Sequence, residues 1–252
     1  MHETITIDPA YHGFEGAGHG GYTSGMAAKI AGGPVEVTIR RRIPVGEPME
    51  VRRLEGGRIE LRGAEGPILQ AAPGEPRVEL PTPVGPAEAE DAARRFLGYT
   101  WTPSSTCLTC GTHRDEGEGL RVFPGPVAGR PGLVAAPWVP HPNFAGQDGL
   151  LPEEFVWAAL DCPGAWALRG DPSEPYRRTV TVQMTARVDR PVRAGEPHVV
   201  MAWPVPGRRR LLDAACAVIG PDGRVAAVAT TVWLPAERPG VGIPTFAAER
   251  GT

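Results

Sequence analysis

The sequence predicts an α+β fold made of two copies of one unit, each an antiparallel sheet wrapped around a central helix, packed together as a pseudo-dimer. Two apolar, helix-like runs, at residues 22–30 and 152–168, are each followed by a series of strand-like segments. The tripeptide Gly-Glu-Pro occurs in register before a strand-like segment in each half, at residues 46–48 and 195–197. A repeat of about 110 residues indicates duplication of a whole fold unit, because the repeats of a solenoid are only about 20–50 residues long.

The first half begins with a short strand and a glycine-rich loop at residues 13–21, and a helix follows that ends near Ile30. Gly32, Gly33 and Pro34 stop this helix. The later segments alternate apolar and polar side chains between glycine-containing turns, which is typical of half-buried strands. The strands expected in this half cover residues 4–7, 35–39, 49–53, 58–62 and 68–72.

The second half repeats this order. Its helix, at residues 152–168, is apolar on nearly every face, so it is expected to lie inside a curled sheet and not on a solvated surface. The segments around it are rich in valine, threonine and alanine, which favours strands. The strands expected in this half cover residues 120–123, 133–138, 179–188, 198–203, 211–219 and 225–233.

A proline-rich stretch at residues 73–86, together with the segment at 87–96, is expected to connect the two copies. We place the boundary near Gly98. The expected units are therefore residues 1–98 and 99–252, with a CxxC-containing connection at residues 99–118.

The composition narrows the classes of partner. The net charge of −3 and the scattered basic residues argue against binding to nucleic acid. No apolar stretch reaches the roughly 18 residues that cross a bilayer, and the first residues lack the basic flank and apolar core of a signal peptide. We expect a cytoplasmic protein without a membrane partner, and assembly into a homo-oligomer is left open. A reducing cytosol would keep the four cysteines as thiols unless a metal holds some of them.

Two features suggest an acyl-thioester site. Gly20 and Gly21 follow His19 where the first helix starts, and a helix start leaves about four N–H groups without intrahelical partners. The glycines would let a thioester oxygen reach these groups, unless they only cap the helix. Asp161 is an acid within an apolar stretch, which suggests a general base or a nucleophile. Its alternative role is to bind backbone groups at a kink caused by Pro163.

Three short motifs, in this order and spacing, resemble the hotdog-fold acyl-CoA thioesterase-like proteins, in the double-hotdog form of acyl-CoA thioesterase II. Residues 16–22 resemble the glycine pair that starts the central helix of that fold. Residues 158–161 resemble the segment that carries the catalytic aspartate, and residues 221–227 resemble the last hairpin. The resemblance covers most of the chain in outline and implies tandem hotdog folds.

The resemblance implies hydrolysis of a small or medium acyl-CoA or acyl-carrier-protein thioester, without a cofactor. Asp161, Gly20 and Gly21 would be catalytic. The family pairs its aspartate with a threonine and a glutamine on later strands. Counting from the last hairpin puts Val205 and Thr231 at those places, so Thr231 is a further catalytic candidate and the glutamine is missing.

Substrate contacts are expected from His19, Tyr22 and Trp157, although each also fits a capping or core role. Two other functions remain open. The missing glutamine favours a non-catalytic protein that binds acyl or lipid-like ligands in the same tunnel. A hotdog enoyl hydratase or dehydratase would need a histidine base facing an acid, for which His12 or His19 could serve.

Cys107 and Cys110, followed by His113, have the spacing of half a zinc site, which normally needs four ligands. His141 could complete a set, but two free thiols in a turn between the units are the simpler interpretation. Cys162 is a candidate nucleophile that lacks a histidine nearby in sequence, and Cys216 is expected in the core.

Overall fold

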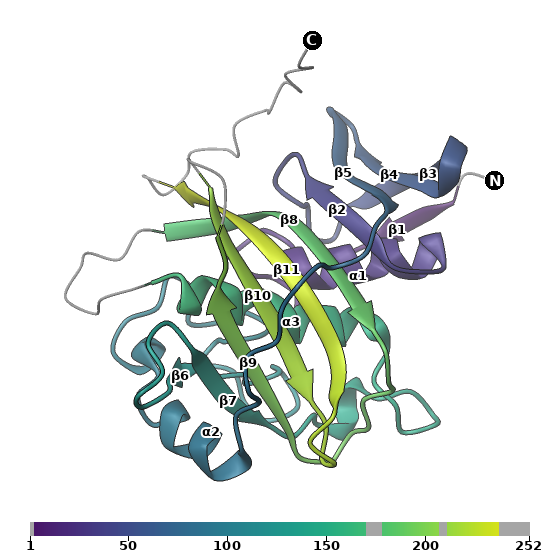
Figure 1. The fold of residues 1–252 in the computed structure, drawn as a ribbon. Coiled ribbons are helices and arrows are strands. Elements are labelled where there is room, and N and C mark those ends of the chain that lie inside the picture. The colour runs from purple at the N-terminus through teal and green to yellow at the C-terminus, as the bar shows by residue number, and fades with distance from the viewer. Residues whose placement is uncertain (1–2, 170–177, 207–210, 237–252) are drawn as a thin grey trace.

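The structure, a computed structural model, describes residues 3–169, 178–206 and 211–236 (Figure 1). Its helices are α1 (Gly20–Ala31), α2 (Pro86–Ala93) and α3 (Glu153–Ala167), with 3-10 turns at Glu55–Gly57, Leu97–Tyr99 and Pro142–Phe144. The strands are β1 (Thr4–Thr6), β2 (Val35–Ile39), β3 (Pro48–Leu54), β4 (Arg58–Gly63), β5 (Gly66–Pro73), β6 (Gly125–Pro126), β7 (Val134–Trp138), β8 (Arg178–Val188), β9 (His198–Pro204), β10 (Leu212–Ile219) and β11 (Val225–Ala236).

All the named strands form one antiparallel sheet with the order β1-β3-β4-β5-β2-β8-β11-β10-β9-β7-β6. In the first half, β3, β4 and β5 form a meander, and β5 pairs with β2, the strand that follows α1. In the second half, β9, β10 and β11 form a meander, and β11 pairs with β8, the strand that follows α3. The halves meet where β2 pairs with β8, with Val35 opposite Ala186 and Thr38 opposite Gln183.

Helices α1 and α3 lie side by side against one face of this sheet (Figure 1). The alternation along β9 shows how the two faces differ. Val200 and Ala202 point into the main core with the two helices, whereas Val199 and Met201 join a second apolar cluster on the opposite face. Helix α2 covers that cluster where β6, β7 and β9 lie. None of the helices in the described part of the chain is long and apolar enough to span a bilayer.

The prediction of a strand at residues 120–123 is wrong. The backbone amides of Leu120 and Val122 donate to the carbonyls of Leu108 and Thr109 at 2.8 and 2.9 Å, so this segment is bound to the CxxC loop and not to a sheet neighbour. Both side chains are buried in the main core, which explains their apolar character. The segment expected only as a connection, residues 87–96, contains most of α2.

Candidate active site

Helix α1 approaches α3 closely because its contact face carries glycine. A Cβ on Gly21 would lie 2.6 Å from the Cβ of Asp161 and 2.7 Å from the carbonyl oxygen of Trp157. A Cβ on Gly25, one turn later, would lie 2.5 Å from the Cα of Glu154. These distances are shorter than van der Waals contact, so the glycines determine how closely the two helices pack. The start of α1 is thereby pressed against the middle of α3.

The carboxylate of Asp161 is buried between these elements, with 2% of the residue exposed. Its Oδ2 accepts a hydrogen bond from the Gly21 N–H at 2.7 Å, and its Oδ1 accepts one from the Thr181 hydroxyl at 2.7 Å. Burial raises the pKa of Asp161, although a nearby His19 charge and the bonds from Thr181 and Gly21 act in the opposite direction. A carboxylate with a raised pKa is a stronger base than an ordinary one.

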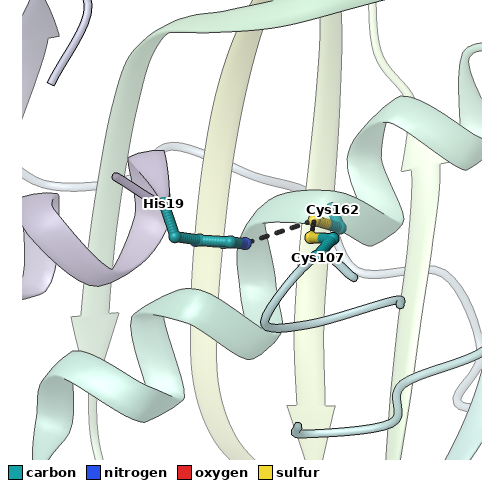
Figure 2. Close-up of side chains that lie close together, drawn as sticks. All are labelled: His19, Cys107 and Cys162. Carbon is teal, nitrogen blue, oxygen red and sulfur yellow. Dashed lines mark hydrogen bonds between the residues drawn. The ribbon is translucent and has the colours of Figure 1, made fainter. Parts of the chain in front are cut away.

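His19 lies next to this carboxylate and caps α1. Its Nδ1 accepts from the Tyr22 N–H at 3.3 Å and lies 3.7 Å from Asp161 Oδ2. Burial alone would lower the pKa of His19, but the Cys107 thiol and the Asp161 charge outweigh this and raise it. The ring edge opposite Nδ1 faces sulfur, with Nε2 3.3 Å from Cys162 Sγ (Figure 2). The same Nε2 lies 3.0 Å from the Thr109 hydroxyl.

No protein-family model and no curated protein matches the chain. Solved structures do. TesB2 of Mycobacterium marinum, an acyl-CoA thioesterase II, aligns with a TM-score of 0.56 and 12% identity over 87% of this chain and 91% of that chain. The tesB protein of Mycobacterium avium subs paratuberculosis aligns with a TM-score of 0.56 and 15% identity, over 87% of this chain and 88% of that chain.

A third solved structure, a conserved protein of unknown function with a hot dog fold from Alicyclobacillus acidocaldarius, covers 94% of this chain and 93% of that chain. Its TM-score is 0.56 and its identity is 11%. The chain has a hotdog fold. The resemblance expected from the sequence is confirmed at the level of the fold, and these low identities show the fold alone.

Several of the expected site residues meet at one place in this hotdog fold. His19, Gly20, Gly21 and Asp161 lie together, and Gly20 is close enough that a Cβ on it would lie 3.2 Å from Asp161 Oδ2. One detail differs from the expectation. The Gly21 N–H is not left free, because the Asp161 carboxylate itself occupies it.

Thr231 lies on β11, opposite Met184 of β8. Its hydroxyl donates to the Ala214 carbonyl at 3.4 Å and accepts from Trp233 Nε1 at 2.8 Å. Its hydroxyl oxygen faces Gly164, where a Cβ would lie 2.6 Å from it. Val205 begins the segment after β9, and its amide bonds to the Asp213 carbonyl. Neither residue is among the hydrogen-bond partners found for Asp161 in the described part of the chain.

Thr181 on β8 is the threonine that contacts Asp161, and sequence reasoning missed it. The available signal was the pair Thr179 and Thr181, which alternate along a strand predicted to follow the helix of Asp161. The two positions counted from the last hairpin, Val205 and Thr231, both lie later in the chain than β8.

Tyr22 and Trp157, the other expected substrate contacts, are both buried. Tyr22 packs within an aromatic group in tilted arrangements, with ring centroids 4.8 Å from Tyr11 and 5.2 Å from Phe155. Two hollows of about 540 and 290 Å³ have linings that do not include Asp161. The first lies beside the start of α3 near Leu150 and Val188.

The CxxC loop also reaches this region. Cys107 Sγ lies 3.6 Å from Cys162 Sγ, and both lie beside His19 (Figure 2). Interactions with Cys110, Cys162 and His19 hold the pKa of the Cys107 thiol well below its ordinary value, while the pKa values of Cys110 and Cys162 are raised. His113, which the CxxC spacing offered as a candidate metal ligand, is exposed and lies outside the candidate metal-binding group found among the described residues.

Proposed function

We propose that this chain hydrolyses acyl thioesters, with small or medium acyl groups carried by coenzyme A or by an acyl-carrier protein. One observation carries the proposal. The Asp161 carboxylate is held at the start of α1 by the Gly21 N–H and oriented from the other side by the Thr181 hydroxyl, each at 2.7 Å. The similarity to a solved structure named as an acyl-CoA thioesterase II adds support through the fold.

The proposed reaction begins with an exchange of partners at Gly21. The thioester carbonyl oxygen takes the Gly21 N–H, so the positive end of α1 stabilises the negative charge that develops on this oxygen. Asp161 stays oriented by Thr181. It then either removes a proton from the attacking water or attacks the carbonyl carbon to give an anhydride that water opens. Either course gives the free acid and releases the carrier as a thiolate, which takes a proton from Asp161 in the first course or from water in the second.

We propose that Thr181, and not the catalytic candidate Thr231, positions Asp161, because Thr181 is the residue whose hydroxyl donates to Asp161. Tyr22 and Trp157 are proposed to line the acyl group beside the catalytic carboxylate, with His19 at its edge. The aromatic group around Tyr22 and Phe155 supports an apolar surface next to α1. Binding of the acyl group would require these packed side chains to separate.

The same proposal covers the architecture. We infer tandem hotdog units, residues 1–98 and 99–252, packed as a pseudo-dimer in a cytoplasmic protein. The strand order supports this. Outward from the β2–β8 junction, β2-β5-β4-β3-β1 on one side corresponds to β8-β11-β10-β9-β7 on the other, and α1 and α3 pack side by side. The first unit would supply Gly21 and the second Asp161 and Thr181.

The test is hydrolysis of a panel of acyl-CoA and acyl-carrier-protein thioesters by the purified protein and by Asp161→Asn. We expect the substitution to lower kcat by about 10²–10⁴, the usual contribution of a positioned acid or base. Asp91→Asn on the surface of α2 is the matched control and should leave kcat unchanged. Equal rates for Asp161→Asn and the control would remove Asp161 from the mechanism, and an acyl ligand retained without turnover would favour the non-catalytic binder.

The contact between His19 and Asp161 favours a second candidate function, enoyl thioester hydration. The two groups face each other at 3.7 Å, as a histidine base and an acid would in such a site. An assay with an enoyl-CoA distinguishes the two candidates. Hydration removes the ultraviolet absorbance of the conjugated double bond without releasing a thiol, whereas hydrolysis releases a free thiol.

A further inference from the structure

Three cysteines and one histidine gather in the interior, although they come from separate parts of the sequence. His19 precedes α1, Cys107 and Cys110 lie in the loop after α2, and Cys162 lies on α3. We propose that these four side chains bind one zinc ion, with His19 bound through Nε2 and the cysteines through Sγ. The proposal does not depend on the proposed hydrolysis.

The spacing of the ligand atoms fits a tetrahedral ion. Bond lengths of about 2.3 Å to sulfur and about 2.0–2.1 Å to nitrogen place two sulfurs about 3.8 Å apart and a sulfur and a nitrogen about 3.6 Å apart. The observed separations are 3.6 Å between Cys107 and Cys162 and 3.3 Å between Cys162 and His19 Nε2. All three atoms lie within 4.8 Å of one another. Small adjustments of the side chains would suffice to centre an ion among them.

Cys110 is the proposed fourth ligand. It packs in one buried cluster with Cys107 and Cys162, and its thiol interacts with both of their thiols. Cys110 lies outside the group of ligand atoms that are within 4.8 Å of one another, so its Sγ would have to move closer to the other ligands to share the ion. The turn that carries it is tight. The Gly111 N–H donates to the Cys107 carbonyl at 3.0 Å, and a Cβ on Gly111 would lie 2.5 Å from that oxygen. This compact Cys-x-x-Cys-Gly turn keeps the two cysteine side chains together, as a shared ion requires.

The loop is held against the N-terminal segment by bonds outside the cluster. The Leu108 N–H donates to the His12 carbonyl at 2.9 Å, and the Ser104 hydroxyl donates to the Gly13 carbonyl at 2.7 Å. The buried Arg114 donates to the carbonyls of Thr106, Glu118 and Ala10. These hydrogen bonds hold the loop that carries Cys107 beside the segment that carries His19.

The chemistry of this group suits zinc. Thiolate and imidazole ligands in a set of four are typical of structural zinc, whereas magnesium and calcium require oxygen ligands. The aromatic rings of Phe96, Phe123 and Trp166 pack around the cysteines, and Cys107 and Cys110 are buried. Each thiol that binds releases its proton to the solvent. With four protein ligands no position remains for substrate, so the ion would be structural.

Binding through Nε2 fixes the tautomer of His19. The ring proton then resides on Nδ1, which lies 3.7 Å from Asp161 Oδ2, longer than a hydrogen bond. A closer approach of the two groups on metal binding would give the carboxylate–histidine–zinc arrangement that orients metal-bound imidazoles. In this state Nδ1 no longer accepts from the Tyr22 N–H at 3.3 Å, and Thr109 keeps its bond to the Ala158 carbonyl at 2.8 Å. In the metal-bound form, the His19 ring thus loses the long hydrogen bond from the Tyr22 N–H and gains a bond from Nε2 to the ion.

The first test uses the full chain, expressed with zinc in the medium and analysed for metals by mass spectrometry. We expect one zinc per chain that survives dialysis and is released to a colorimetric chelator when a mercurial blocks the thiols. Protein loaded with cobalt instead should show the intense visible bands of tetrahedral Co²⁺ and a thiolate-to-cobalt charge-transfer band. A metal content well below one, or an octahedral cobalt spectrum, would overturn the proposal.

Variants locate the ligands. Cys107→Ala and Cys110→Ala should each lose the metal or lower its affinity by at least about a hundredfold, while Cys216→Ala, a buried cysteine on β10, and His113→Ala should retain it. If a ligand variant fails to fold, Cys162→His, which keeps a zinc ligand, should shift the cobalt spectrum of folded protein. Full metal content with an unchanged cobalt spectrum in the cysteine variants would refute the assigned ligands.

Discussion

Replacing Thr181 with valine tests whether its hydroxyl holds the buried carboxylate of Asp161. The substitution keeps the branched shape and removes the donor at 2.7 Å from Oδ1. Because the acceptor is a carboxylate at 2% exposure, the lost bond is a charge-assisted one, contributing about 1.5–3 kcal/mol. For a chain of this length a change of 1 kcal/mol shifts Tm by about 2–4 °C, so we expect Tm to fall by roughly 3–12 °C.

The same free energy sets the expected effect on hydrolysis. An interaction of equal strength in the ground state and the transition state leaves kcat unchanged. If the Thr181 bond gains its full strength only in the transition state, its loss lowers kcat about ten- to two-hundredfold, since about 1.4 kcal/mol corresponds to a factor of ten. Thermal unfolding and thioester hydrolysis are measured on the same preparations. Thr181→Ser keeps a hydroxyl and should recover much of both quantities.

Thr185→Val is the matched control on the same strand. Its hydroxyl makes no hydrogen bond within the described part of the chain, so we expect a change in stability of less than about 1 kcal/mol. If Thr181→Val and Thr185→Val unfold at the same temperature and hydrolyse thioesters equally fast, the Thr181 hydroxyl does not support Asp161, and the assigned positioning role is wrong.

Three further predictions concern the stability of the fold. Gly21→Ala should destabilise the fold by about 1–3 kcal/mol because its Cβ would overlap Asp161 and Trp157, whereas Gly33→Ala, with open space around it, should not; equal denaturant midpoints would contradict this. Burial lowers the pKa of His198 below its ordinary value of 6.5, so below that pH the unfolded chain binds a proton that the folded chain does not, and stability is lost as the pH falls. His198→Gln should therefore reduce the dependence of the unfolding free energy on pH between about pH 7 and pH 5, and an unchanged dependence would contradict this. Chelation of the zinc-loaded protein should lower its Tm, and addition of zinc should restore it.

The fold could be predicted from the sequence where a pattern reports directly on burial. The helix of Asp161 is apolar all round because the sheet and α1 enclose it, and the alternation along residues 35–39 matches β2. The apolar pattern gave a wrong prediction at residues 120–123, because a buried apolar segment that bonds to a loop has the same sequence pattern as a buried strand. It also gave no helix for residues 86–93, whose alanines and acids begin with proline at the first helical turn.

The site was predicted only where its residues are marked locally. Gly20, Gly21 and Asp161 stand out from their neighbours, and the structure brings them together, while their catalytic roles stay a prediction. The cluster of His19 with Cys162 was not predicted, because it joins residues 143 positions apart through a loop whose path the sequence does not reveal. Local spacing therefore pointed to His113, which is near the CxxC pair along the chain and exposed in the fold.

His19 belongs to both proposed sites, and each of its ring nitrogens faces one of them. Nε2 faces the sulfurs, whereas Nδ1 faces Asp161 and the first turn of α1. An ion held by four side chains has no open position, so it would affect hydrolysis only by fixing the imidazole beside the carboxylate. Cobalt in place of zinc should then leave kcat unchanged, because both ions hold the ring in the same place. A kcat that changes with the metal would instead place the ion in the reaction and would contradict the closed, structural site.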